Sequence, residues 1–171
     1  MILKLVKPSL VIEQVYHDYI SEWENTGEKI VPYPSRRDDP DFSKVLDRWE
    51  AESTDMAFEK GFVPSSLYFA INETGGIYGA VHIRHILNEA LLKHGGHIGY
   101  GVRPSERKKG IATQMLSMAL PIAKDLGIDR VLVTCDKTNT ASAKTIINNG
   151  GILENEVLEG ERITQRYWIS L

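Results

Sequence analysis

The stretch GYGVRPSERKKGIAT, residues 99–113, decides how this chain folds. It begins as a strand that ends at Val102, continues through the basic turn RKKG at residues 107–110, and becomes helical at Ile111. The first turn of an α-helix carries main-chain N–H groups that have no partner within the helix, and these add to the positive end of the helix dipole. A strand that runs through such a turn into a helix is therefore typical of a site that holds an anion.

The residues of this turn favour a phosphate in particular. Gly110 has no Cβ, so an anion can approach the backbone closely. Arg107, Lys108 and Lys109 place three cations at a helix N-terminus, where acidic residues are normally preferred, and a bound polyanion would relieve that conflict. The same turn could instead be a solvated basic loop with an ordinary glycine, and the turn alone does not decide between the two interpretations.

The strand before the turn indicates a longer ligand. Gly99 and Gly101 weaken a strand, and such glycines often mark a bulge or the close approach of a ligand. A strand edge with unpaired N–H and C=O groups can also pair with an amide-containing ligand as it would with another strand. These features together fit a ligand that places a diphosphate at the helix N-terminus and a peptide-like arm along the strand. Coenzyme A has this construction.

The rest of the chain supplies helices and strands around this stretch. Apolar residues at helical spacing predict three further helices, and β-rich runs bounded by turn residues predict six further strands. The expected helices cover 9–26, 41–50, 110–126 and 139–149, and the expected strands cover 1–5, 67–71, 77–83, 97–102, 131–135, 152–157 and 162–169. Residues 30–40 contain three prolines and are expected to be irregular. This order predicts an α/β fold of the α+β type, with a central mixed, mainly antiparallel sheet flanked by helices.

Composition excludes several classes of protein. The 171 residues suit a single domain over 1–171, and a net charge of −3 gives no reason to expect a nucleic acid or an anionic membrane as partner. No apolar run is long enough to cross a bilayer, and no export signal is present, so we expect a cytoplasmic protein. The single cysteine, Cys135, excludes an intrachain disulfide and is expected to be a small buried residue of a strand. No zinc-ligand spacing is present, so no metal site is expected.

Two separated segments resemble one known family. VRP at residues 102–104 followed by RxxGxA at 107–112 is similar to the acetyl-CoA-binding motif of the GNAT superfamily of N-acetyltransferases. Asn139-x-x-Ser142 and NGG at 149–151 resemble the second conserved segment of that family. The resemblance covers residues 67–169 in element order and is closest to a bacterial branch of predicted acetyltransferases that shares runs such as VPSS and TCDK.

The resemblance implies a role for particular residues. The amide of Val102 would bond the pantetheine arm, Asn139 would bond the pantetheine or the acetyl end, and Ser142 would lie beside the same arm. The main chain of six consecutive residues would hold the diphosphate of acetyl-CoA, with Thr113 nearby: Arg107, Lys108, Lys109, Gly110, Ile111 and Ala112.

Two departures from the family pattern concern the catalytic groups. Ile146 stands where many members carry the tyrosine that protonates the departing thiolate, and no Asp or Glu occurs in residues 96–102, where some members carry a general base. His97 and Tyr100 are the titratable residues of this strand, so they are the candidate base and acid. Strand alternation places them on opposite faces unless a bulge intervenes. The pattern favours a bland role for each, with His97 as a surface or satisfied core residue and Tyr100 as a packing residue.

The function expected from these observations is transfer of an acetyl group from acetyl-CoA, as cosubstrate, to an amine by direct attack. The acceptor is a small-molecule or peptide amine that the sequence does not identify, and residues 30–39 are the candidate wall of its site. A non-catalytic coenzyme A-binding or sensing module and a generic phosphate-binding protein are the alternatives. The C-terminal hairpin could pair across a homodimer.

Overall fold

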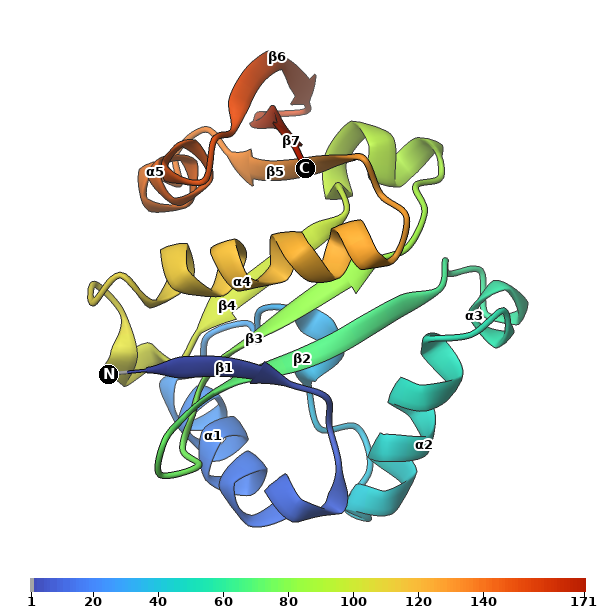
Figure 1. The fold of residues 1–171 in the computed structure, drawn as a ribbon, viewed down its shortest axis with the longest axis vertical. Helices are drawn as coiled ribbons and strands as arrows, with labels where there is room; N and C mark the ends of the chain where they lie inside the picture. Colours follow the sequence, from blue (N-terminus) through green and yellow to red (C-terminus); the bar gives the residue numbers. More distant parts are fainter. Residues whose placement is uncertain (1) are drawn as a thin grey trace.

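The computed structural model describes residues 2–171 and divides them into helices and two sheets (Figure 1). The strands are β1 Leu3–Val6, β2 Ser65–Asn72, β3 Ile77–Arg84, β4 Ile98–Val102, β5 Arg130–Asp136, β6 Ile152–Glu159 and β7 Arg162–Ser170. The α-helices are α1 Glu13–Thr26, α2 Phe42–Glu52, α3 Met56–Glu59, α4 Ile111–Asp125 and α5 Thr140–Asn148. Short helical turns occupy Leu10–Ile12, Tyr33–Ser35, Leu91–Gly95 and Pro104–Glu106.

The strands form a four-stranded sheet in the order β1-β2-β3-β4 and a three-stranded sheet in the order β5-β7-β6. Every neighbouring pair is antiparallel. The predicted α/β class and its mainly antiparallel pairing are confirmed, whereas the expectation of one mixed sheet is corrected to two antiparallel sheets. The break lies between β4 and β5, where the chain crosses over through α4 (Figure 1).

Two clusters of buried side chains hold the layers together. One lies between α4 and the four-stranded sheet and continues to β5 and α5; it includes Ile111, Met115 and Val133. The other lies between the opposite face of that sheet and helices α1 and α2, and it includes Tyr16 and Trp49. The first sheet is therefore covered on both faces, by α4 on one side and by α1 and α2 on the other (Figure 1).

The helix limits follow from local chemistry. Gly27 adopts a left-handed conformation (φ 68°) directly after α1, and the side chain of Asp41 caps α2 by accepting a bond from the Ser43 N–H. Pro121 lies inside α4 without ending it. Both Pro121 and Ser117, whose carbonyl loses its helical partner, are exposed, so water can satisfy that carbonyl. No helix among residues 2–171 combines the length and apolarity needed to span a bilayer.

Candidate functional site

The outer edge of β4 is the first part of the site. The N–H of Arg84 donates to the His97 carbonyl and the N–H of Arg103 donates to the Tyr78 carbonyl, so the odd-numbered residues of β4 turn their main-chain groups toward β3. The N–H groups of Tyr100 and Val102 therefore point to the opposite edge. No strand pairs with that edge in the described sheets, so both amides are available to a ligand that lies along β4.

The two sheets meet at one point beside this edge. The His97 N–H donates to the Leu132 carbonyl (2.7 Å), and the Leu132 N–H donates to His97 Nδ1 (2.9 Å). Beyond this junction β4 and β5 diverge toward their C-terminal ends, and the start of α4 lies on the side where they are apart (Figure 1). The unpaired edge of β4 thus leads from the junction toward the N-terminus of α4.

The turn before α4 is the second part of the site. Lys108 (φ 63°) and Gly110 (φ 76°) both adopt left-handed conformations, and no side chain caps the helix. Within the described part of the chain, the six consecutive N–H groups of residues 108–113 have no hydrogen-bond acceptor. Successive unpaired amides in alternating conformations form a concave anion site, so the turn fits a diphosphate. Gly110 is needed for its positive φ. Nothing in the described chain lies within 4 Å of a Cβ built there, so the space in front of it is open to a ligand.

The cations of this turn differ from the sequence expectation in one respect. Arg107 forms two bonds to the Glu28 carboxylate (2.7 and 3.0 Å), and its guanidinium stacks 5.1 Å from the centre of the Trp23 ring. Lys109 pairs with Glu106 at 2.9 Å. Two of the three predicted cations are therefore paired with carboxylates of the chain, so the turn offers a phosphate its main-chain N–H groups and the charge of Lys108.

Arg103 fixes the turn to α1, a role that sequence reasoning missed. Its guanidinium bonds Asp18 (2.8 Å) and Glu22, and the Glu22 carboxylate also accepts from the Ser105 N–H (2.7 Å). Burial raises the pKa of Glu22, but the bonds from Ser105 and Arg103 outweigh it and leave the pKa below its ordinary value. Glu22 is therefore a fixed carboxylate. Nothing in a single sequence marks this pairing across more than 80 positions.

The third part of the site is the start of α5. Asn139 caps this helix, since its Oδ1 accepts from the Ser142 N–H at 3.0 Å. The Ser142 hydroxyl in turn lies 2.8 Å from the Tyr100 hydroxyl. The structure thus brings together Tyr100, Ser142 and the Asn139 cap, which the sequence placed on separate elements. Because the Asn139 Oδ1 already accepts this bond from the helix, the side-chain NH₂ is the group that can bind a ligand.

The Tyr100 hydroxyl is protonated at neutral pH. Burial raises its pKa to about 12, even though its hydrogen bond to Ser142 lowers it. The side chain is partly buried and packs in the cluster around α4 and α5. A phenol that keeps its proton beside a strand edge can donate that proton to a developing anion.

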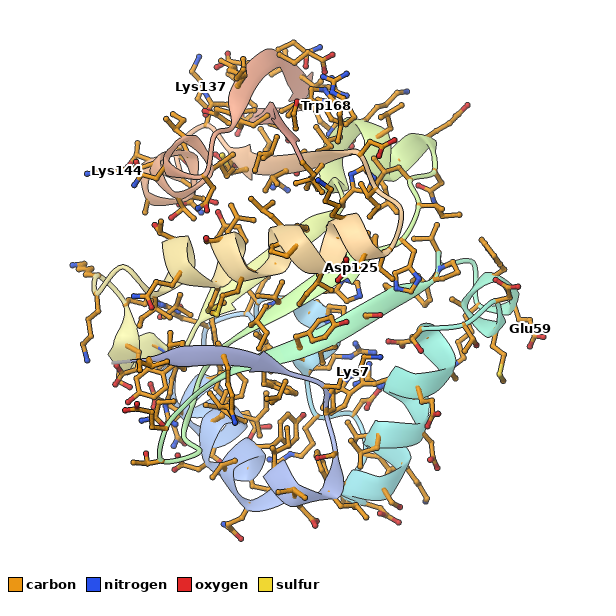
Figure 2. All side chains as sticks on the ribbon, in the orientation of Figure 1. Lys7, Glu59, Asp125, Lys137, Lys144 and Trp168 are labelled. Carbon is orange, nitrogen blue, oxygen red and sulfur yellow. The ribbon has the colours of Figure 1, made fainter. Side chains whose placement is uncertain are left out.

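His97 has a structural role in this site. Its Nδ1 accepts the Leu132 N–H, so the ring proton of the neutral form is on Nε2 and no lone pair remains for an incoming proton. Burial, followed by the charge of Arg84, lowers its pKa to about 4. The ring also packs edge-on against Trp168, at 6.5 Å between ring centres. Figure 2 labels Trp168 among the side chains of the C-terminal sheet. The geometry therefore argues against the expected base at His97 and does not bring it together with Tyr100.

Ile146 is a core residue. Its side chain is fully buried, and a Cβ on Gly151 would lie 2.4 Å from its Cγ2. Its position explains the NGG sequence at 149–151, because the chain after α5 passes too close to Ile146 for any side chain on Gly151. Cys135 is also buried, as expected from its strand, and burial raises the pKa of its thiol.

The glycines of β4 serve a different contact from the one the sequence indicates. A Cβ on Gly101 would lie 1.8 Å from the Val31 carbonyl oxygen, and a Cβ on Gly99 would lie 3.9 Å from Pro32 Cβ. The close approach at Gly101 is therefore made by the chain's own residues 30–40 and not by a ligand. This contact places the irregular segment against β4, where we expected one wall of an acceptor site. The described residues contain no group of three or more His, Cys, Asp or Glu side chains that could hold a metal ion.

Comparison with known proteins agrees with this geometry. The family model described as "Acetyltransferase (GNAT) domain" matches residues 5–152. No curated protein matches the sequence significantly. Among solved structures, the fold is similar to the Microcin C7 self immunity acetyltransferase MccE in complex with acetyl-CoA and AMP. That match has 21% identity and a TM-score of 0.66, and it covers 99% of this chain and 92% of that one.

Two further structures have the same fold. RimL, a ribosomal alpha-N-protein acetyltransferase in complex with coenzyme A, has 16% identity, a TM-score of 0.68, and coverage of 99% of this chain and 94% of that one. A chimera of the spermidine N-acetyltransferase SpeG from Vibrio cholerae has 13% identity, a TM-score of 0.65, and coverage of 98% and 95%. With the family match over most of its length, the chain belongs to the GNAT acetyltransferase family and is an acyl-CoA-dependent N-acetyltransferase.

Proposed function

We propose that this acetyltransferase binds acetyl-CoA along one continuous series of unpaired main-chain N–H groups. The pantetheine amides pair with the free edge of β4 at Val102, and the diphosphate binds the turn of residues 107–113. The Asn139 amide and the Ser142 hydroxyl meet the arm from α5. The observation that carries the proposal is the run of N–H groups in residues 108–113 that have no acceptor in the described chain.

The acetyl group then passes directly to the acceptor. The amine nitrogen forms a bond to the thioester carbonyl carbon, the C–S bond breaks, and the released thiolate takes the proton of the Tyr100 hydroxyl. The amine loses its own proton to water, and solvent restores the proton of Tyr100. The unpaired edge of β4 orients the carbonyl, so the chain contributes chiefly orientation and hydrogen bonding. No acyl-enzyme on Cys135 is involved.

The acceptor is proposed to be a small-molecule or peptide amine that reaches β4 between residues 30–40 and the two sheets. Residues 1–171 would act as a single domain in the cytoplasm, where the buried Cys135 stays reduced. A homodimer is proposed through β6, an edge strand whose Ile152 and Leu158 are 74% and 70% exposed. Light scattering of the purified chain at rising concentration tests this state, and a monomeric mass throughout would contradict it.

Replacement of Gly110 tests the placement of the diphosphate. Gly110→Leu puts a side chain into the concave turn, and we expect coenzyme A affinity measured by calorimetry to fall by more than about 100-fold. Gly127→Leu is the matched control, because Gly127 ends the same helix with a similar backbone (φ 82°) and open space around it. It should bear the same strain and bind coenzyme A as the unaltered chain does.

Two outcomes would contradict the proposal. Retained affinity in Gly110→Leu, at an unchanged far-UV spectrum, would move the diphosphate elsewhere. Tight binding of acetyl-CoA without thiol release on any amine of a broad panel would favour a non-catalytic binding module instead.

A further inference from the structure

Arg84 is a cation that the chain does not neutralise. It is the last residue of β3, and its Nη1 donates to the carbonyls of Gly95 (3.2 Å) and Gly96 (3.0 Å). Both side-chain hydrogen bonds of Arg84 within residues 2–171 come from Nη1, so Nε and Nη2 keep free donors, and no carboxylate pairs with Arg84 there. The side chain of Arg84 is partly buried, and this burial lowers its pKa. A guanidinium that is held in place, with free donors and no counter-charge, is suited to bind an anion bidentately.

His82 provides a second, independent observation. It lies two residues before Arg84, on the same face of β3, and it is only 6% exposed. Its Nδ1 is sealed from solvent and has no hydrogen-bond partner in the described structure. A buried polar atom without a partner is unfavourable, and in native structures it commonly marks a place that a bound molecule or water fills.

The ionisable groups that act on the pKa of His82 are all basic. Burial and then the charges of Arg84, His85 and Arg48 lower the pKa of His82 to about 3, so its ring is neutral. Arg48 by contrast is neutralised, by Asp38 at 2.9 Å and Glu52 at 3.5 Å. Arg84 is thus the charge in this region that lacks a partner in the described chain.

The position of this pair relates it to the proposed acceptor site. His82 stands directly opposite Gly99 in the β3–β4 ladder, so the missing side chain of Gly99 leaves room beside it. Pro32, from the segment expected to form the acceptor wall, is the nearest atom to a Cβ built on Gly99, at 3.9 Å. Gly99 immediately precedes Tyr100, whose amide is on the free edge of β4. Arg84 and His82 therefore flank the face of β4 from which an acceptor would approach.

We propose that the acceptor carries a carboxylate close to its amine, as an amino acid does, and that Arg84 binds this carboxylate while the His82 ring hydrogen-bonds the same molecule. The carboxylate supplies the counter-charge that Arg84 lacks, and it fixes the amine over Gly99 beside the free edge of β4. The inference rests on the proposed function for the location of the acetyl group. It distinguishes this chain from an enzyme for polyamines, whose ammonium groups Arg84 would repel.

Matched pairs of amines test this substrate class. Leucine with isoamylamine, phenylalanine with phenethylamine, and lysine with cadaverine differ only in the carboxylate, and spermidine provides an acceptor without one. We expect kcat/KM for at least one amino acid to exceed that for its decarboxylated partner by more than about 10-fold. Arg84→Gln should abolish that preference without changing KM for acetyl-CoA, Arg84→Lys should restore part of it, and the exposed Arg162→Gln should leave it intact.

A binding measurement separates this inference from the proposed function. N-acetyl-leucine and N-acetyl-isoamylamine are titrated by calorimetry into the protein saturated with coenzyme A. We expect only the carboxylate to bind, and Arg84→Gln to weaken it by more than about 10-fold. Preference for spermidine or the decarboxylated amines, equal binding by Arg84→Gln, or failure of every N-acetyl amino acid to bind would overturn the inference. Failure of coenzyme A itself to bind would overturn the proposed function instead.

Discussion

Tyr100 is the residue whose chemistry depends most on its surroundings. Its phenol lies 2.8 Å from Ser142, and its raised pKa keeps it protonated at any pH near neutrality. We expect Tyr100→Phe to lower kcat by about 100-fold with little change in KM for acetyl-CoA, because proton donation to the thiolate is lost while binding is kept. Steady-state kinetics of thiol release measure both quantities.

Ser142→Ala is the control for that experiment. This substitution removes a hydrogen bond to the phenol but leaves the phenol its proton. Its kcat should therefore lie between that of the unaltered chain and that of Tyr100→Phe. An unaltered kcat in Tyr100→Phe would show that the thiolate leaves unassisted. The identity of this residue as a candidate was readable from the sequence, but its partner on α5 was not, since 42 positions separate the two.

His97 makes the free energy of unfolding depend on pH. Its pKa is about 4 in the folded chain, whereas that of an unfolded histidine is about 6.5. As the pH falls, the unfolded chain therefore protonates this histidine before the folded chain does. The contribution of His97 to the free energy of unfolding is complete above about pH 6.5 and is lost as the pH drops toward 4. Urea unfolding at a series of pH values measures this loss.

His97→Asn isolates this contribution. The asparagine Oδ1 can still accept the Leu132 N–H but does not titrate, so the loss of stability between about pH 6.5 and 5 should become shallower. His82 and His85, whose pKa values are also lowered, add to the slope with the same sign. An identical slope in the variant would show that the pKa of His97 does not differ between the folded and unfolded chain.

At the scale of the element, the two glycines of β4 differ in whether the structure has room for a side chain at their position. A Cβ on Gly101 would meet the Val31 carbonyl at 1.8 Å, whereas a Cβ on Gly99 would have ordinary contact at 3.9 Å. We expect Gly101→Ala to destabilise the fold by about 1–3 kcal/mol, or to displace residues 30–40, because the clash involves backbone. Gly99→Ala should remain close to the unaltered chain in thermal unfolding.

Equal effects of the two substitutions would contradict the contact between Val31 and β4. The glycines themselves were visible in the sequence, and so were most limits of the strands and helices, because spacing and turn residues determine these locally. The reason for Gly101 was not visible. A close approach from residues 30–40, which the three prolines make irregular, has no periodic pattern to reveal it.

At the scale of the whole molecule, acetyl-CoA is expected to stabilise the fold by linking its two sheets. A ligand that binds only the folded chain raises the free energy of unfolding by about 2.7 kcal/mol at 100 times its Kd. The melting temperature should therefore rise with coenzyme A concentration. Differential scanning fluorimetry measures this rise, which should be absent in Gly110→Leu and present in Gly127→Leu.

The fold of the whole molecule could be predicted from the sequence only in part. The order of elements predicted an antiparallel α/β protein with an anion site before α4, because each motif is local. It did not predict that the sheet divides after β4, since hydrophobic patterns determine which face of a strand is buried and not which edges pair. The ion pairs that join Arg103 to α1 and Arg107 to the segment after α1 are likewise contacts between distant parts of the chain.

The division between the sheets has a consequence for the acyl groups that fit. In the described structure the main chains of β4 and β5 are joined by the bond from the His97 N–H to the Leu132 carbonyl, and the return bond from the Leu132 N–H goes to the His97 ring, so no continuous ladder sets the angle between the two strands. Side-chain packing between α4 and β5 sets that angle instead, through core residues such as Met115 and Val133. A methylene gained or lost there, remote from any substrate atom, would widen or narrow the opening and thereby shift the preferred length of the transferred chain.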